Sequence, residues 1–224
     1  DIRRLKRLCD AIISEGFSSL HFIMQASVDG IAKDPSIAQL LARAGFRIVF
    51  LGIESGNQRN LDTLSKSYSA EKTKQVVRSL HDQGIAVVGG FIIGNPEDRP
   101  SDIWDVFRFA REIGVDHSIV QCLTPYPETE IRKSLQHRGF ITNEYDYKLY
   151  NGFIVNVKTD FMDPLTVARE LVKAGVVYYN NPIPMAKSLL WQYARSSFLK
   201  FLRVNGRFIR SGWKNRMFES THRF

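Results

Sequence analysis

Glycines and carboxylates follow two apolar runs of this 224-residue sequence. The run at 90–97, GFIIGNPE, ends in Glu97, and the run at 47–53 is followed by Glu54 and Ser55. Glycine lets a flat ring or a ribose approach the main chain where a side chain would collide, and a carboxylate can bind ribose hydroxyls or an ammonium group. The pattern predicts a nucleoside pocket. Two ordinary βα turns are the alternative, because glycine and acidic residues are common in any loop.

Four apolar segments alternate with amphipathic segments at the spacing of βα units. The predicted strands are 19–26, 47–53, 85–93 and 116–123, and the predicted helices are 2–13, 36–44, 70–83, 101–113 and 128–137. Val and Ile occupy both faces of the strands, as in a parallel sheet covered by helices. The carboxyl ends of parallel strands meet at one rim. We therefore expect the two acidic strand ends to meet there with Thr124 and Tyr126, which follow the fourth strand.

The strand and helix repeat is too short for a closed barrel. An eight-stranded barrel needs about 250 residues, and the repeat here ends near Gly139. The predicted fold class is α/β, with residues 1–142 as the C-terminal portion of a partial (β/α) TIM-like barrel whose first strands precede Asp1. An open doubly wound sheet is the alternative. Residues 143–224 are predicted to form an α-rich extension, with a strand at 153–157 and helices at 164–179, 184–203 and 207–218.

Residues 5–139 resemble the radical S-adenosylmethionine (radical SAM) enzymes, in particular the branch that often carries an upstream cobalamin-binding domain. The spacing Gly90-x-Ile92-x-Gly94-x-x-Glu97 is similar to the family's fifth-strand pattern. In that pattern the central apolar residue packs on the adenine. The sequence LGIES around Glu54 is similar to the end of the fourth strand, where the acid reaches the ribose or the methionine amino group.

Two further segments carry the resemblance. PYPET at 125–129 is similar to the sixth-strand Pro-x-Pro-Gly-Thr, with Glu128 in place of glycine, and Lys66 stands where the family supplies a cation to the cofactor carboxylate. Ser27 departs from the Arg often found in related sequences, which puts the contribution of the third strand in doubt. The resemblance implies S-adenosylmethionine as a ligand of Glu54, Ser55, Lys66, Gly90, Ile92, Gly94, Glu97, Thr124 and Tyr126.

The family's Cys-x-x-x-Cys-x-x-Cys motif, which holds three irons of a [4Fe–4S] cluster, is absent. Cys9 and Cys122 are too few and too far apart to replace it. We expect the cluster ligands to lie upstream of Asp1, no metal site on this chain, and no 5′-deoxyadenosine formation by the chain alone. In the whole protein the resemblance implies that a reduced cluster cleaves S-adenosylmethionine to a 5′-deoxyadenosyl radical. Cobalamin is a further cofactor that the branch suggests.

Two other functions stay open at this point. The missing cysteines equally permit a non-catalytic module that binds a nucleoside or S-adenosylmethionine, and a different barrel enzyme is the third interpretation. Lys66 could instead form a Schiff base, but it lies past the strand in a Ser-rich segment. The five histidines show no spacing typical of metal ligands. Catalytic residues are therefore not predicted.

The positive charge is concentrated at the C-terminus. Nine of the 31 Lys and Arg residues, but one of the 23 acidic residues, lie in 185–224, so the remainder of the chain is neutral. Aromatic residues interleave with these bases, which suits a solvated face over the barrel or a helix on an anionic membrane. Nucleic acid is the least favoured partner. The sequence contains no leader and no apolar run of 18 residues, so we expect a cytoplasmic protein. The basic tail at 185–224 suggests peripheral membrane contact, and the tail together with the family branch suggests a small, hydrophobic or lipid-like substrate.

Overall fold

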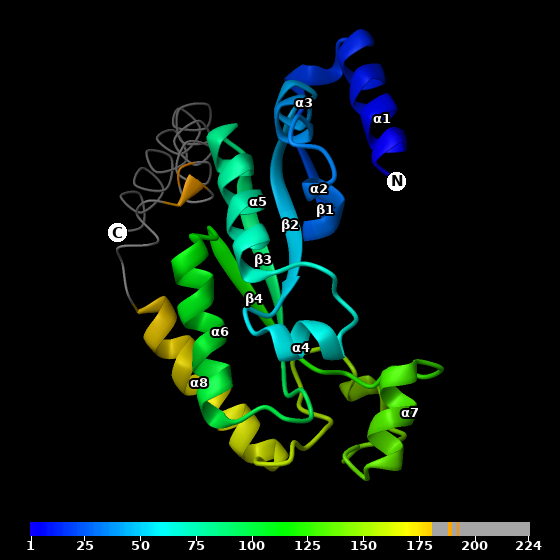
Figure 1. Cartoon of the computed structure of the whole chain (residues 1–224), viewed down its shortest axis with the longest axis vertical. Coiled ribbons are helices and arrows are strands. Elements are labelled where there is room, and N and C mark those ends of the chain that lie inside the picture. The colour runs from blue at the N-terminus through cyan, green and yellow to red at the C-terminus, as the bar shows by residue number, and fades with distance from the viewer. Residues whose placement is uncertain (181–187, 190–191, 193–224) are drawn as a thin grey trace, which may run out of the picture.

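The structure, a computed structural model, describes residues 1–180, 188, 189 and 192. A sheet of four parallel strands in the order β1-β2-β3-β4 forms its centre (Figure 1). The strands are β1 (Phe22–Ser27), β2 (Phe46–Glu54), β3 (Ala86–Ile93) and β4 (His117–Cys122). Parallel strands that follow one another in chain order are the arrangement of one arc of a (β/α) barrel. The predicted α/β fold is confirmed.

Helices connect the strands and continue beyond the last of them. The α-helices are α1 (Ile2–Ser14), α2 (Val28–Ala32), α3 (Ile37–Arg43), α4 (Gln58–Thr63), α5 (Ala70–Asp82), α6 (Pro100–Ile113), α7 (Glu130–His137) and α8 (Pro164–Tyr179), with 3₁₀ turns η1 (Phe17–Ser19) and η2 (Tyr147–Leu149). In Figure 1, α5 and α6 lie over the same side of the sheet and α8 runs beside α6. The Trp104 indole of α6 donates to Glu170 Oε2 of α8 at 3.0 Å, which ties these helices together.

Local signals in the sequence explain where the longer helices begin and end. The Ser69 hydroxyl accepts from Lys72 N and caps α5, as predicted. Gly84 and Gly114 follow α5 and α6 with φ values of 70° and 75°, which is the left-handed conformation that ends helices. The short helices α2 and α4 were not predicted. Their capping residues Ser27 and Asn57 each accept from a backbone N–H in the first turn.

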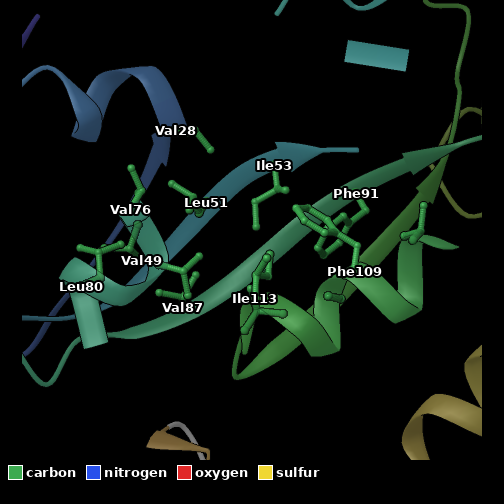
Figure 2. Close-up of a cluster of buried hydrophobic side chains, with 14 of the residues drawn as sticks. Val28, Val49, Leu51, Ile53, Val76, Leu80, Val87, Phe91, Phe109 and Ile113 are labelled. Carbon is green, nitrogen blue, oxygen red and sulfur yellow. The ribbon is translucent and has the colours of Figure 1, made fainter. Parts of the chain in front are cut away.

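The two faces of the sheet differ in exposure. On the face that the helices cover, Leu51 and Phe91 are 0% and 1% exposed, and they pack with Leu80 of α5 and Phe109 of α6 (Figure 2). On the other face Ile23 is 69% exposed. We call this second side the open face. By strand register it carries Ile23, Gln25, Ile48, Phe50, Gly52, Val88, Gly90, Ile92, Ile119 and Gln121.

Two predicted boundaries need correction. The first strand begins at Phe22 and not at 19, because Phe17–Ser19 form the turn η1. Helix α7 begins at Glu130 and not at 128. Glu128 has a left-handed φ of 61°, which a helix cannot contain, and the Thr129 hydroxyl caps the helix by accepting from its third residue.

The predicted strand at 153–157 is wrong. Asn151 Oδ1 accepts from the backbone N–H groups of Phe153 and Ile154 at 2.9 and 3.1 Å, so these groups are held in a local turn. Among the described residues this segment makes one isolated bridge, between Ile141 and Val157. The apolar composition of this segment did not reveal that Asn151 accepts from the N–H groups that a strand would need.

The helix predicted at 164–179 is confirmed as α8. The helices predicted at 184–203 and 207–218, and the membrane contact of 185–224, lie outside the described residues except at 188, 189 and 192. Within the described part, no helix is both long and apolar enough to cross a membrane. The division of the chain at residue 142 stays a prediction.

Candidate functional site

Glu54, the last residue of β2, has an unusual backbone conformation. Its φ is 62°, a value that residues other than glycine rarely adopt. Ser55 N donates to Ile53 O at 2.7 Å and closes a γ-turn around Glu54. The pairing of β2 with β3 also shifts register between Gly52 and Glu54. Such strained residues cost free energy and gather at functional sites, which makes the end of β2 a candidate.

The Glu54 carboxylate folds back over Gly52. A Cβ atom at position 52 would lie 3.1 Å from Glu54 Oε1, so the carboxylate lies on the side to which residue 52 would point a side chain. That side is the open face, because Gly52 pairs in register with Gly90. Lys66 Nζ lies 3.1 Å from the same Oε1, and the Lys66 and Glu54 side chains are 32% and 17% exposed. An acid and a base therefore lie together at the rim of the open face.

Ile92 lies on the same face, two residues beyond Gly90 in β3. It packs against a small apolar cluster that includes Leu123. Gly90 has a role in the packing of the chain itself, because a Cβ atom there would lie 2.8 Å from the Phe50 ring. The missing side chain at position 90 therefore makes room for a ring of the chain itself. Glu54 and Ile92 share one face of the sheet.

The loop after β3 is organised around Asp98, which the sequence did not single out. Asp98 is 1% exposed. Its Oδ2 accepts from the N–H groups of Gly94 and Asn95 at 2.9 Å each, and its Oδ1 accepts from Asn60 Nδ2 at 2.8 Å. Burial raises the pKa of Asp98, and the hydrogen bonds from Asn60 and Asn95 oppose that rise. Gly94 has a φ of 80°, so glycine is needed at this position for the backbone to form the turn.

Ser55 and Glu97 lie apart from the Glu54 carboxylate. Ser55 is 1% exposed, and it lines a cavity of about 440 Å³ beside α6. Glu97 lines another cavity, of about 470 Å³, between α4 and α7. Of the predicted set, the structure brings Lys66 to Glu54, and it directs Ser55 and Glu97 to other surroundings.

Thr124 and Tyr126 hold the loop after β4. The Thr124 hydroxyl donates to Cys122 O at 3.0 Å, and the Tyr126 hydroxyl donates to Tyr150 O at 3.1 Å. Below them, the buried Arg132 guanidinium donates to Pro125 O at 2.8 Å. These contacts fix the loop and leave Tyr126 50% exposed beside the carboxyl end of β4.

Tyr68 is a residue of this rim that sequence reasoning missed. It is 2% exposed, and its hydroxyl reaches Gly52 O at 3.2 Å and Ile53 O at 3.1 Å. Burial raises the pKa of Tyr68, and the charges of Glu54 and Asp29 raise it further, so the phenol is a neutral donor. The surrounding sequence SKSYS is ordinary for a loop and carried no signal of this contact.

Neither cysteine of the sequence is suited to hold an iron–sulfur cluster. The two cysteines, Cys9 and Cys122, are buried and free. Burial raises the pKa of Cys122 to about 11, and burial followed by the charge of Asp10 raises the pKa of Cys9. Iron–sulfur clusters bind thiolates, which such thiols do not readily form. Within the part of the chain that the structure describes, no three His, Cys, Asp or Glu side chains are grouped to hold a metal.

Comparison with known proteins assigns part of the chain to a family. The model of the Radical SAM superfamily matches residues 2–110. Residues 2–110 belong to the radical SAM superfamily. Bacteriochlorophyllide d C-8(2)-methyltransferase of Chlorobaculum tepidum is 29% identical over 177 residues, which are 78% of this chain and 37% of that protein. The chain thus spans a little over a third of the length of this relative.

Solved radical SAM structures share the fold. Coproporphyrinogen III oxidase (HemN) from Escherichia coli matches with a TM-score of 0.58 and 12% identity, over 80% of this chain and 37% of that one. The methyltransferase TsrM from Kitasatospora setae, whose structure contains cobalamin and a [4Fe–4S] cluster, matches with a TM-score of 0.53 and 19% identity, over 59% of this chain and 26% of that one. The four parallel strands therefore correspond to part of a radical SAM barrel. Membership of the superfamily implies S-adenosylmethionine and a [4Fe–4S] cluster as cofactors.

Proposed function

We propose that this chain forms the S-adenosylmethionine-binding part of a cobalamin-dependent radical SAM methyltransferase. Support for methyl transfer comes from the bacteriochlorophyllide methyltransferase and TsrM, and support for cobalamin comes from TsrM. A hydrophobic ring compound is the substrate class that fits best. The relative acts on a bacteriochlorophyllide, and apolar side chains such as Phe50, Val88 and Ile119 are half-buried on the open face.

One observation carries the proposal, namely the Glu54 and Lys66 pair over Gly52 at the rim of the open face. S-adenosylmethionine carries an α-carboxylate, an α-ammonium group and two ribose hydroxyls. Lys66 can bind the carboxylate, and Glu54 can accept from the hydroxyls or the ammonium group. A partly exposed ion pair contributes about 1 kcal/mol or less to stability. Glu54 and Lys66 can therefore separate and bind ligand groups at little cost in free energy.

The chain's own residues bind and orient the cofactor. Ile92 offers an apolar surface on the face that Glu54 shares, which suits an adenine ring. S-adenosylmethionine, once bound, supplies an electrophilic methyl group and the source of a 5′-deoxyadenosyl group. The two buried, free cysteines are not suited to hold the cluster, so the contribution of this chain in the proposal is to fix the position of the nucleoside and to exclude water from it.

Glu54→Gln tests the proposal in the complete protein. The change keeps the shape of the side chain and removes its charge, so the Kd for S-adenosylmethionine, measured by calorimetry without reductant, should rise about tenfold or more. Glu112→Gln is the matched control, because Glu112 forms an ion pair with Lys74 on the helix-covered side of the sheet. Its Kd should stay within about twofold of the unchanged protein. An unchanged Kd for Glu54→Gln would remove the observation on which the proposal depends.

A further inference from the structure

The segment 65–68 crosses from α4 to α5 over the carboxyl ends of two strands, and we call it the strap. Helix α4 ends in a Schellman motif, in which Lys66 N donates to Leu61 O at 2.8 Å and Ser65 N donates to Asp62 O at 3.0 Å. Ser65 has the left-handed φ of 53° that this motif needs. The motif reverses the chain and directs the next residues back toward the sheet.

Three consecutive side chains of the strap contact the strand ends. Lys66 Nζ lies 3.1 Å from Glu54 Oε1, and the Ser67 hydroxyl donates to Asp29 Oδ2 at 2.8 Å, just beyond β1. The Tyr68 hydroxyl reaches Gly52 O at 3.2 Å and Ile53 O at 3.1 Å. The strap therefore ties the ends of β1 and β2 together beside the proposed cofactor site.

We infer that Tyr68 is a positioning residue for S-adenosylmethionine, because it holds the γ-turn that places the Glu54 carboxylate over Gly52. This inference rests on the proposed function. The turn needs support, since Glu54 has a left-handed φ and the register with β3 shifts at this point. The Tyr68 hydroxyl meets the two carbonyl groups that immediately precede Glu54. Without that donor the turn can relax, and the carboxylate can move away from Gly52.

The chemistry of Tyr68 suits this role. Its phenol is buried and stays protonated at neutral pH, so it donates and does not compete with Glu54 as a second anion. Phenylalanine would fill the same volume and leave both carbonyl groups without the donor. Tyr68→Phe therefore isolates the hydrogen bond from the packing of the ring.

The experiment measures the Kd for S-adenosylmethionine without reductant in the complete protein. Tyr68→Phe should raise the Kd about fivefold to tenfold. Tyr178→Phe is the matched control, because Tyr178 is also a buried tyrosine, with its hydroxyl 2.9 Å from Ser118 Oγ near the amino end of β4. That variant should bind within about twofold of the unchanged protein.

A double-mutant cycle with Glu54→Gln separates positioning from a general loss of structure. If Tyr68 acts through Glu54, Tyr68→Phe should change the Kd by less than about twofold in the Glu54→Gln background. Multiplied effects of the two changes would overturn the inference, as would normal binding by Tyr68→Phe alone. A Glu54→Gln protein that binds normally would instead overturn the proposed function. If Tyr68→Phe does not fold, Ser67→Ala takes its place, because it loosens the same strap. Ser67→Ala should raise the Kd about twofold to fourfold in the protein with Glu54 and leave it unchanged in the Glu54→Gln protein. An unchanged Kd for Ser67→Ala in the protein with Glu54 would overturn the inference.

Discussion

The loops after β2 and β3 resemble each other in sequence, but their carboxylates have different surroundings. Each follows a buried strand, and each places a carboxylate near a glycine. Asp98 in the second loop is 1% exposed and accepts hydrogen bonds from Gly94 N, Asn95 N and Asn60 Nδ2. Glu54 in the first loop is partly exposed and has Lys66 Nζ beside its Oε1.

This difference distinguishes a carboxylate that builds a loop from one that can bind a ligand. The hydrogen-bonding capacity of Asp98 is used by the chain itself, so a ligand would have to displace buried donors. The Glu54 carboxylate is partly exposed on the open face, where a ligand could reach its oxygens. The two acidic residues look similar in the sequence, but they differ in the number of hydrogen-bond donors that contact them in the fold.

Asp98→Ala gives the largest expected effect. It leaves four buried donors without this partner, and we expect a loss of about 3 kcal/mol in the free energy of unfolding, measured by urea denaturation. Glu54→Ala is the companion variant, and it should cost about 1 kcal/mol or less because its ion pair is partly exposed. Equal losses in the two variants would break the distinction between the loops.

Asp116 extends the comparison to the amino end of the sheet and predicts a pH dependence. Its Oδ2 accepts from Val87 N at 2.8 Å and lies 2.9 Å from His81 Nε2. Burial alone would raise the pKa of Asp116, but the hydrogen bonds from His81, Val87 N and Leu189 N hold it below the ordinary 3.8. A carboxyl group whose pKa is lowered by folding stabilises the protein above its unfolded pKa, and that contribution is lost as the pH falls through its folded pKa.

Asp116→Asn should therefore cost about 2 kcal/mol at pH 6 and clearly less at pH 3. Urea unfolding of both proteins at the two pH values gives the difference directly. Asp160→Asn, which removes a partly exposed partner of Arg138, is the control and should change stability by about 1 kcal/mol or less at pH 6. A cost for Asp116→Asn that does not fall with pH would show that the charge of Asp116 has no part in holding this corner.

The sequence predicted the parts of the fold that depend on local pattern. Apolar runs located all four strands, and Ser69 and Gly114 marked helix ends because capping acts within a few residues. The rim was also predictable, since the carboxyl ends of parallel strands meet whatever their loops contain. The pairing of Lys66 with Glu54 was not. The sequence suggested a cofactor contact for each of them separately.

What sequence reasoning missed depends on contacts between distant residues. Asn60 and Asp98 are 38 positions apart, and the Tyr68 hydroxyl meets carbonyl groups 15 and 16 positions earlier. Neither contact has a periodic signal, because a single side chain meets a single backbone group. The sequence also did not reveal that the Phe50 ring fits against Gly90, because that contact is visible only once β2 and β3 are paired.

Gly94 lies in the loop after β3 and Gly52 just before the loop after β2, and the two differ in backbone conformation. Gly94→Ala forces alanine into a φ of 80° and should cost about 1 to 2 kcal/mol of stability. Gly52 has no such φ, and a Cβ there meets the Glu54 carboxylate at 3.1 Å. Gly52→Ala should therefore change stability by less than about 1 kcal/mol and still raise the Kd for S-adenosylmethionine about fivefold. Reversed effects on stability and binding would contradict the roles given to the two loops.

Lys66→Gln should have the smallest effect on stability and a clear effect on binding. The Lys66 side chain is 32% exposed and its ion pair with Glu54 is screened by solvent, so the loss of stability should be about 0.5 kcal/mol. Lys74→Gln is a close control, because the Lys74 side chain is also 32% exposed and forms an ion pair with Glu112.

Both variants should unfold at nearly the same urea concentration, and only Lys66→Gln should weaken S-adenosylmethionine binding, by about tenfold, because it loses the cation for the ligand carboxylate. Added salt should narrow the difference in Kd between Lys66→Gln and the unchanged protein, since it screens a charge that solvent can reach. If Lys66→Gln instead lost more than about 2 kcal/mol of stability and bound S-adenosylmethionine normally, the comparison of the loops would fail. The charges at the end of β2 would then stabilise the fold, as the Asp98 carboxylate does, and would not bind a ligand.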